Sequence, residues 1–162
     1  MNHINLNDKK GITLFSVTIS ILVLIIIVTM VTHFGMQSLN RTTNAKLYSN
    51  LTLLMTKIEE YKDKNDFNNS PFPGKNLDSE DKAFLNQYNL VTANTDLTAF
   101  RRIEKSDLEA MGLPKSILQT GQKIYVDYKR KEIISTKGYI KQNNRVVFKY
   151  SSMKKEVLDE KY

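Results

Sequence analysis

The sequence predicts an α+β fold: a long N-terminal helix, membrane-spanning in its first half and amphipathic in its second, packed on a small C-terminal antiparallel β-sheet. Three observations predict it: an uncharged apolar run near the N-terminus, apolar residues at helical spacing after it, and alternating apolar residues beyond Gly121. With 162 residues, the chain has room for one ordinary domain and little room for two.

The apolar run predicts a membrane helix. No formally charged residue lies between Lys10 and Arg41, apart from any proton on His33. Residues 12–31 read ITLFSVTISILVLIIIVTMV, and about 20 helical residues span roughly 30 Å, the thickness of a bilayer's hydrocarbon core. Because Lys9 flanks the N-terminal end together with Lys10, the positive-inside rule predicts a single-pass plasma-membrane protein with a cytoplasmic N-terminus and an extracellular C-terminal part.

The N-terminal boundary of this run carries a motif. Residues 8–16 read DKKGITLFS, so a short basic leader ends in one glycine and the apolar helix begins at the next residue. This resembles the class III signal peptide of type IV prepilins and pseudopilins. The resemblance implies that a prepilin peptidase recognises Lys10, Gly11 and Ile12, cuts after Gly11 and methylates the new amine of Ile12. It also implies that the helix leaves the bilayer and assembles, through the pilus machinery, with the helices of other pilin-like subunits.

One residue departs from the family pattern. Most family members have glutamate at the fifth mature position, where this chain has Ser16. The resemblance implies that this glutamate neutralises the terminal amine of an adjacent subunit during assembly. A serine makes that contact one-sided, which suits a minor subunit present in few copies. The alternative is a family branch that assembles without the glutamate.

An apolar run near the N-terminus is also typical of secretory signals and of plain membrane anchors. A cleaved secretory signal has an apolar core of about 7–15 residues and a small-x-small cleavage site, and neither feature is present. A plain anchor would give a single-pass membrane protein with an extracellular ligand- or partner-binding domain. The prepilin interpretation predicts four parts: a cleaved leader (residues 1–11), a membrane and filament-core helix (12–32), an amphipathic extension (33–65) and a small extracellular α+β domain (66–162).

The extension and the domain are predicted from periodicity. Apolar residues follow one face of a helix after residue 46; they are Leu47, Leu51, Leu54, Met55, Ile58 and Tyr61. A loop is expected over residues 65–74, then a helix capped by Asp78 or Ser79, and another introduced by Ser106 in a capping box.

The C-terminal third predicts three or four short strands. Ile124, Val126 and Tyr128 alternate with polar neighbours, Asn143-Asn144 suits a tight turn, and Val146, Phe148 and Tyr150 form an alternating apolar set. Residues 122–140 also resemble the C-terminal part of pilin-like proteins from low-GC Gram-positive bacteria, with Lys129, Arg130 and Lys131 in place of the usual turn glycine. The tail, residues 151–162, is expected to fray.

Composition excludes most enzymes. The chain has no cysteine, two histidines and six glycines, so it offers no thiolate or histidine metal site, no triad and no phosphate-binding glycine loop. We expect no enzymatic activity and no cofactor.

With 24 Lys and Arg against 17 Asp and Glu, the net charge is +7. The cluster Lys129, Arg130 and Lys131 suggests contact with DNA or the anionic cell wall; the solvated or wall-facing interpretation is the one we favour over DNA.

Overall fold

A computed structural model of the protein describes the backbone of residues 6–92, 94–141 and 143–159. Side chains are described over the same ranges except residues 6–15, 33, 36 and 37. Contacts divide the chain into two compact units, Met1–Thr42 and Thr43–Tyr162. Within the described residues, no helix combines the length and the apolar character needed to cross a bilayer.

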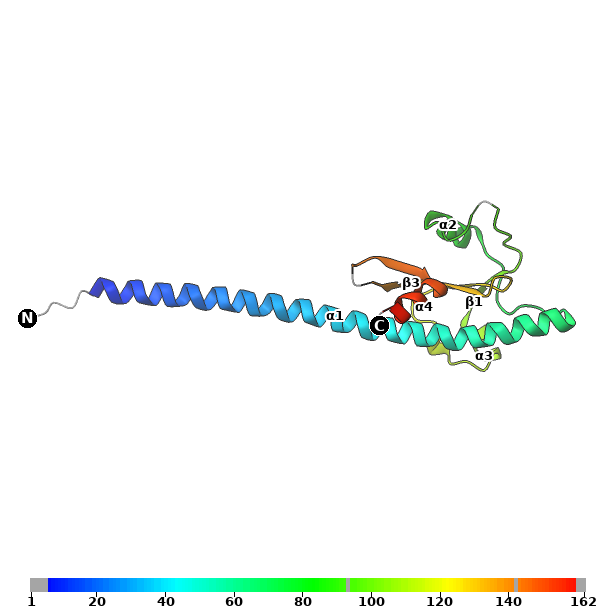
Figure 1. Ribbon diagram of the computed structural model, residues 1–162, viewed down its shortest axis with the longest axis horizontal. Helices are drawn as coiled ribbons and strands as arrows, with labels where there is room; N and C mark the ends of the chain where they lie inside the picture. Colours follow the sequence, from blue (N-terminus) through cyan, green and yellow to red (C-terminus); the bar gives the residue numbers. More distant parts are fainter. Residues whose placement is uncertain (1–5, 93, 142, 160–162) are drawn as a thin grey trace, which may run out of the picture. The chain divides into compact units, whose positions relative to one another are not determined.

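The fold class is α+β, as predicted (Figure 1). The helices and strands follow in the order α1 (Leu6–Asn68), α2 (Ser79–Gln87), β1 (Phe100–Ile103), α3 (Lys105–Ala110), the 3-10 turn η1 (Lys115–Ile117), β2 (Ile124–Asp127), β3 (Glu132–Ile140), β4 (Val146–Lys149) and α4 (Tyr150–Asp159). The four strands form one antiparallel sheet in the order β1-β2-β3-β4. Each strand therefore pairs with its neighbour in the chain.

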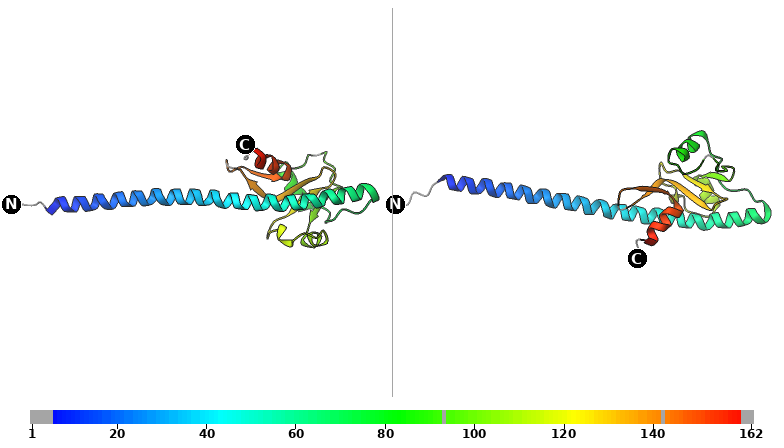
Figure 2. Two further views of the ribbon diagram at one scale, coloured as in Figure 1. Left: turned by 60° about the horizontal axis from the view of Figure 1, so that its bottom comes forward. Right: turned by 45° about the horizontal axis from the view of Figure 1, so that its top comes forward.

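The second unit contains two cores, one on each face of the sheet. In Figures 1 and 2, α2 lies on one side of the sheet and the C-terminal part of α1 lies on the other. The α1-side core joins α1 to inward residues of the strands and to α3 and α4; its buried members include Leu47, Leu51, Leu54, Met55, Ile58, Ile103, Leu108, Ile124, Val126, Ile133, Tyr139 and Met153. The predicted apolar stripe of the extension is confirmed, with Tyr61 partly buried at its end.

The α2-side core was not predicted. It comprises Leu85, Phe100, Tyr125 and Ile134, with Phe84 and Phe148 packed against it. The sequence assigned Tyr125 to the polar face of its strand, yet the side chain is fully buried. The reason is that α2 covers this face, so all four residues of β2 are buried, and an alternation of apolar and polar residues does not show which face is exposed.

Several predicted boundaries were wrong. The strand β1 was missed, whereas the three strands β2, β3 and β4 agree with the three or four that were expected in the C-terminal third. The N-terminal cap of α3 is Glu104, which forms a capping box with Asp107. The predicted cap, Ser106, lies two residues later. α1 continues to Asn68, three residues past the predicted start of the loop, and ends where Asn69 adopts a φ of 55°.

The tail also differs from its prediction. Residues 150–159 form α4, which buries Tyr150 and Met153, where fraying was expected. Tyr150 stacks on Tyr48 of α1, with ring centroids 5.6 Å apart. These two apolar anchors, three residues apart, give α4 a face that docks on the domain. The Asn143-Asn144 turn is confirmed, since Asn144 adopts a φ of 59°.

Candidate functional site

The processing motif falls at the edge of the described region. The backbone of Lys10, Gly11 and Ile12 belongs to α1, while their side chains lie outside the described residues. Ser16 is described and exposed, and its carbonyl oxygen accepts a hydrogen bond from the Ser20 hydroxyl at 2.9 Å. The predicted cut after Gly11 and methylation of Ile12 concern residues whose side chains lie outside the described part of the chain.

The apolar segment, defined as residues 16–32 of α1, exposes large hydrophobic side chains around the helix. These side chains are between 45% and 65% exposed; they are Val17, Ile19, Ile21, Leu22, Val23, Leu24, Ile25, Ile26, Ile27, Val28, Met30 and Val31. The hydroxyls of Thr29 and Thr32 donate to carbonyl oxygens one turn earlier, at 2.7 and 2.8 Å. Back-bonding of this kind satisfies the hydroxyls inside the helix, so they do not need water. The surface of the segment is consequently apolar on every side.

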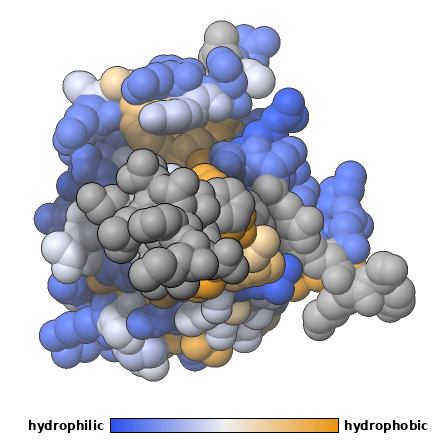
Figure 3. Space-filling view, turned by 90° about the vertical axis from the view of Figure 1, so that its left-hand side faces the viewer, coloured by the Kyte–Doolittle hydropathy of each residue, from blue (hydrophilic) through white to orange (hydrophobic). Residues whose placement is uncertain are grey.

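The second unit has a different surface. On the face shown in Figure 3, hydrophilic residues dominate the surface of this unit, with smaller hydrophobic areas between them. Monomeric proteins seldom expose large contiguous apolar patches. The apolar segment is thus the part of the described chain that most requires a covering partner.

The predicted basic cluster lies in the tight turn between β2 and β3. The carboxylate of Asp127 accepts hydrogen bonds from the backbone N–H groups of Lys129 and Arg130, both at 3.1 Å, and Lys131 takes a positive φ of 53°. The side chain of Asp127 thus stabilises the turn without a glycine. Each basic side chain has an acidic neighbour: Lys129 lies 3.5 Å from Asp96, Arg130 3.8 Å from Asp127, and Lys131 3.7 Å from Asp63.

A buried carboxylate organises the polar interface between α2 and the sheet. Asp81, fully buried, accepts hydrogen bonds from Arg102 at 2.7 Å, from Lys123 at 3.3 Å and from the Tyr125 hydroxyl at 3.1 Å. Its oxygens also cap α2 by accepting from the backbone N–H of Asp78. A buried charge is tolerated when it is paired and hydrogen-bonded in this way.

The ionisation of the surrounding groups follows from these contacts. The hydrogen bond from the Asp81 backbone N–H and the Arg102 guanidinium lower the pKa of Asp78 to about 2. The same pairing with Asp78 raises the pKa of Arg102. Burial, followed by the charge of Asp81, raises the pKa of the Tyr125 hydroxyl. Asp78, Arg102 and Tyr125 are thus held in their ordinary neutral-pH forms, and none of these three is poised to exchange protons near pH 7.

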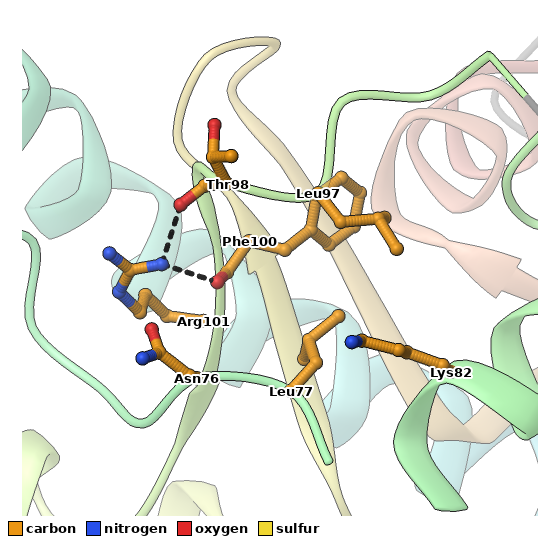
Figure 4. A pocket seen from close by; sticks show the side chains of 7 residues that line it. All are labelled: Asn76, Leu77, Lys82, Leu97, Thr98, Phe100 and Arg101. Atoms are coloured by element: carbon orange, nitrogen blue, oxygen red, sulfur yellow. Dashed lines mark hydrogen bonds between the residues drawn. The ribbon is translucent and has the colours of Figure 1, made fainter. Parts of the chain in front are cut away.

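A pocket of about 410 Å³ lies beside this cluster, between α2, β1 and the loops that precede them (Figure 4). Leu77, Leu97 and Phe100 supply apolar walls. The side chains of Lys82 and Arg101 stand on opposite sides of the pocket in Figure 4. The remaining lining residues are Asn76 and Thr98.

Sequence reasoning missed both the Asp81 cluster and the pocket. The available signal was the acidic pair Asp78 and Asp81 at capping-box spacing, which predicted a helix start but not its partners. Arg102 and Lys123 are distant from Asp81 in the sequence. Because the chain has more basic than acidic residues, the sequence did not indicate which cations pair with this carboxylate. No group of three potential metal ligands occurs among the residues that the structure describes. Comparisons with family models, curated proteins and solved structures found no match.

Proposed function

We propose that this chain is a structural subunit of a type IV pilus or competence-type pseudopilus. The observation that carries the proposal is the apolar segment, whose large hydrophobic side chains are exposed and which begins four residues after Ile12 of the Lys10-Gly11-Ile12 motif. A helix that is hydrophobic all round requires lipid or other helices around it. In the precursor, lipid would surround residues 12–32, which include positions 12–15 outside the described side chains. In the filament, equivalent helices of other subunits would replace the lipid.

The second unit fits the role of the exposed domain of such a subunit. Its part of α1 is amphipathic and buries one face against the sheet, so this stretch has a partner within its own chain. The large hydrophobic side chains of the apolar segment are exposed. This contrast supports different roles for the two parts of α1: the apolar segment would pack against other subunits, and the amphipathic part would carry the domain.

Mass spectrometry of the protein extracted from membranes tests the proposal. We expect a mature N-terminus at Ile12 carrying one additional methyl group. Gly11→Val should leave the leader attached and keep the chain in the membrane, because the peptidase needs a small residue at the cut. Gly35→Val is the matched control, since a Cβ at Gly35 would meet nothing within 4 Å. An intact leader on the parent chain, in cells that possess the peptidase, would instead favour a single-pass membrane protein with a binding domain.

We further propose a minor subunit, because Ser16 cannot supply the negative charge that its glutamate counterpart would offer to a neighbouring amine. A carboxylate within the bilayer costs roughly 2.5–3.5 kcal/mol, and it is tolerated where a cation meets it. Quantitative mass spectrometry of sheared filaments should find this chain scarce. Ser16→Glu should leave processing intact and permit equal or greater incorporation. A chain that proves to be the most abundant subunit would refute the minor role.

A further inference from the structure

The pocket beside α2 has a charge imbalance that its surroundings do not explain. Arg101 and Arg102, two consecutive residues of β1, differ in their acidic partners. Arg102 lies within 4 Å of the carboxylates of Asp78, Asp81 and Glu104. Arg101 has no carboxylate within that distance among the described residues. The positive charge of Arg101 is therefore uncompensated while that of its neighbour is fully paired.

Arg101 is also held in place. One terminal nitrogen of its guanidinium donates to the carbonyl oxygens of Thr98 at 2.7 Å and Phe100 at 2.8 Å (Figure 4). Within the described structure, its other terminal nitrogen and its Nε make no hydrogen bond. A planar guanidinium fixed by two carbonyls and retaining an open edge suits bidentate binding of a carboxylate or phosphate.

Lys82 adds a second cation from the other side. This exposed lysine belongs to α2 and has no acidic partner in the described part of the chain. The nearby carboxylates are already occupied: Glu80 and Asp81 by Lys123, and Asp96 by the backbone and hydroxyl of Thr98. In Figure 4 the Lys82 amine is directed toward Leu77, over the apolar part of the pocket.

The apolar walls define the rest of the ligand. Phe100 is almost completely buried, while Leu77 and Leu97 are half-buried and border the same space. A volume of about 410 Å³ lies within the range of roughly 300–1,000 Å³ typical of small-molecule sites. Such a pocket is too large for a bare inorganic anion and has the mixed lining that organic ligands require.

We propose that this pocket binds a small organic anion, whose phosphate or carboxylate group pairs with Arg101 and whose ring or apolar body lies on Leu77 and Leu97 near Lys82. The proposal stands on the pocket alone and is independent of the assembly role. A filament subunit and an anchored binding protein could equally carry it.

The test is isothermal titration of the full chain in detergent, at low ionic strength, with phenyl phosphate, benzoate, inorganic phosphate and phenol. Phenyl phosphate or benzoate should bind saturably, and more tightly than inorganic phosphate or phenol, which each lack one half of the ligand. Arg101→Gln should weaken binding about tenfold, and Lys82→Gln, which removes the cation beside the ring, should weaken it severalfold. Lys105→Gln, an equal loss of charge at an exposed residue of α3, should leave binding unchanged.

Each alternative result has a definite meaning. Equal weakening by all three variants would show general charge attraction and overturn the proposal, as would the absence of saturable binding in the parent chain. Equal affinity for inorganic phosphate and phenyl phosphate would overturn the proposal that the ligand's apolar body contacts Leu77 and Leu97. Since Arg101 also bonds its own strand, the exposed Lys82 variant separates loss of binding from loss of folding. Binding of phenyl phosphate without binding of benzoate would assign the ligand to the phosphate class.

Discussion

Asn44 pairs with the backbone of Ile140 as a neighbouring strand would. Its Nδ2 donates to the Ile140 carbonyl oxygen at 2.7 Å, and its Oδ1 accepts from the Ile140 backbone N–H at 3.0 Å. The two residues are 96 positions apart, and Asn44 is only 7% exposed. One side-chain amide thus satisfies both hydrogen-bonding groups of the last residue of β3 and fixes that strand end against α1.

Asn44→Ala should destabilise the second unit by about 1–3 kcal/mol, because both Ile140 backbone groups would lose their partner in a largely buried place. Chemical unfolding of the full chain, followed by tyrosine near-UV circular dichroism, measures this. Thr43→Ala, at the exposed adjacent residue, is the control and should change stability little. A loss for Asn44→Ala no larger than the control would mean that water replaces the amide at no cost.

The Asn44 contact illustrates which features sequence reasoning reaches. The stripe from Leu47 to Ile58 was predictable because each residue's role follows from helical spacing alone. Asn44, by contrast, has a low helix propensity and no place in that stripe. Its role depends on a strand almost a hundred residues away, which no local pattern encodes. The same holds for Asp81 and Tyr125, whose burial depends on α2 covering the second face of the sheet.

Gly138 is required by the close approach of β3 and β4. The pairing register shifts between Ile134 and Tyr139, and a Cβ at Gly138 would stand 2.1 Å from Val146 Cγ1 and 3.0 Å from the Val147 carbonyl oxygen. Gly138→Ala should cost about 1–3 kcal/mol through overpacking. Adding Val146→Ala removes the nearest atom, so the double variant should recover part of the loss, measured as a double-mutant cycle. Strictly additive losses would exclude this clash as the cause.

In the cluster of Asp81, Arg102, Lys123 and Tyr125, loss of the Asp81 carboxylate should destabilise the fold more than loss of the Tyr125 hydroxyl. Asp81→Ala would remove the buried carboxylate that Arg102 and Lys123 share, leaving them only their more exposed acidic partners, and should cost about 3 kcal/mol. Tyr125→Phe removes one hydrogen bond among several and should cost about 1 kcal/mol. Urea unfolding of both variants gives the comparison. A larger loss for Tyr125→Phe than for Asp81→Ala would show that the Tyr125 hydroxyl contributes more to this interface than the carboxylate does.

The lowered pKa of Asp78 predicts a stability contribution that depends on pH. The pKa of the Asp78 carboxyl falls from its ordinary value of 3.8 to about 2 in the folded chain. Its stabilisation is therefore complete above about pH 4 and is lost as the pH falls toward 2. Asp78→Asn keeps an effective helix cap but loses the charge that faces Arg102. The parent should be more stable than this variant at pH 6, with the difference beginning to shrink near pH 4 and clearly smaller at pH 3.

The control for this pH series is Glu109→Gln, which removes an exposed acid outside α2. Its stability difference from the parent should not follow the same profile. A difference between the parent and Asp78→Asn that stays constant from pH 6 to pH 3 would contradict the assignment to the Asp78 charge.

The turn that contains Lys129, Arg130 and Lys131 should contribute little to nucleic-acid binding. Each of the three cations lies within 4 Å of a carboxylate, so each offers less charge to a phosphate than its side-chain type suggests. Replacing all three by glutamine should leave the affinity of the full chain for a duplex oligonucleotide, and the salt dependence of that affinity, nearly unchanged. If the three side chains contact phosphates directly, the slope of log affinity against log salt should instead fall by about 2.7, since each contact contributes about 0.9. A fall of that size would assign the turn to DNA and displace the solvated interpretation, because partners as exposed as Asp63 and Asp96 would then have released their lysines to the nucleic acid.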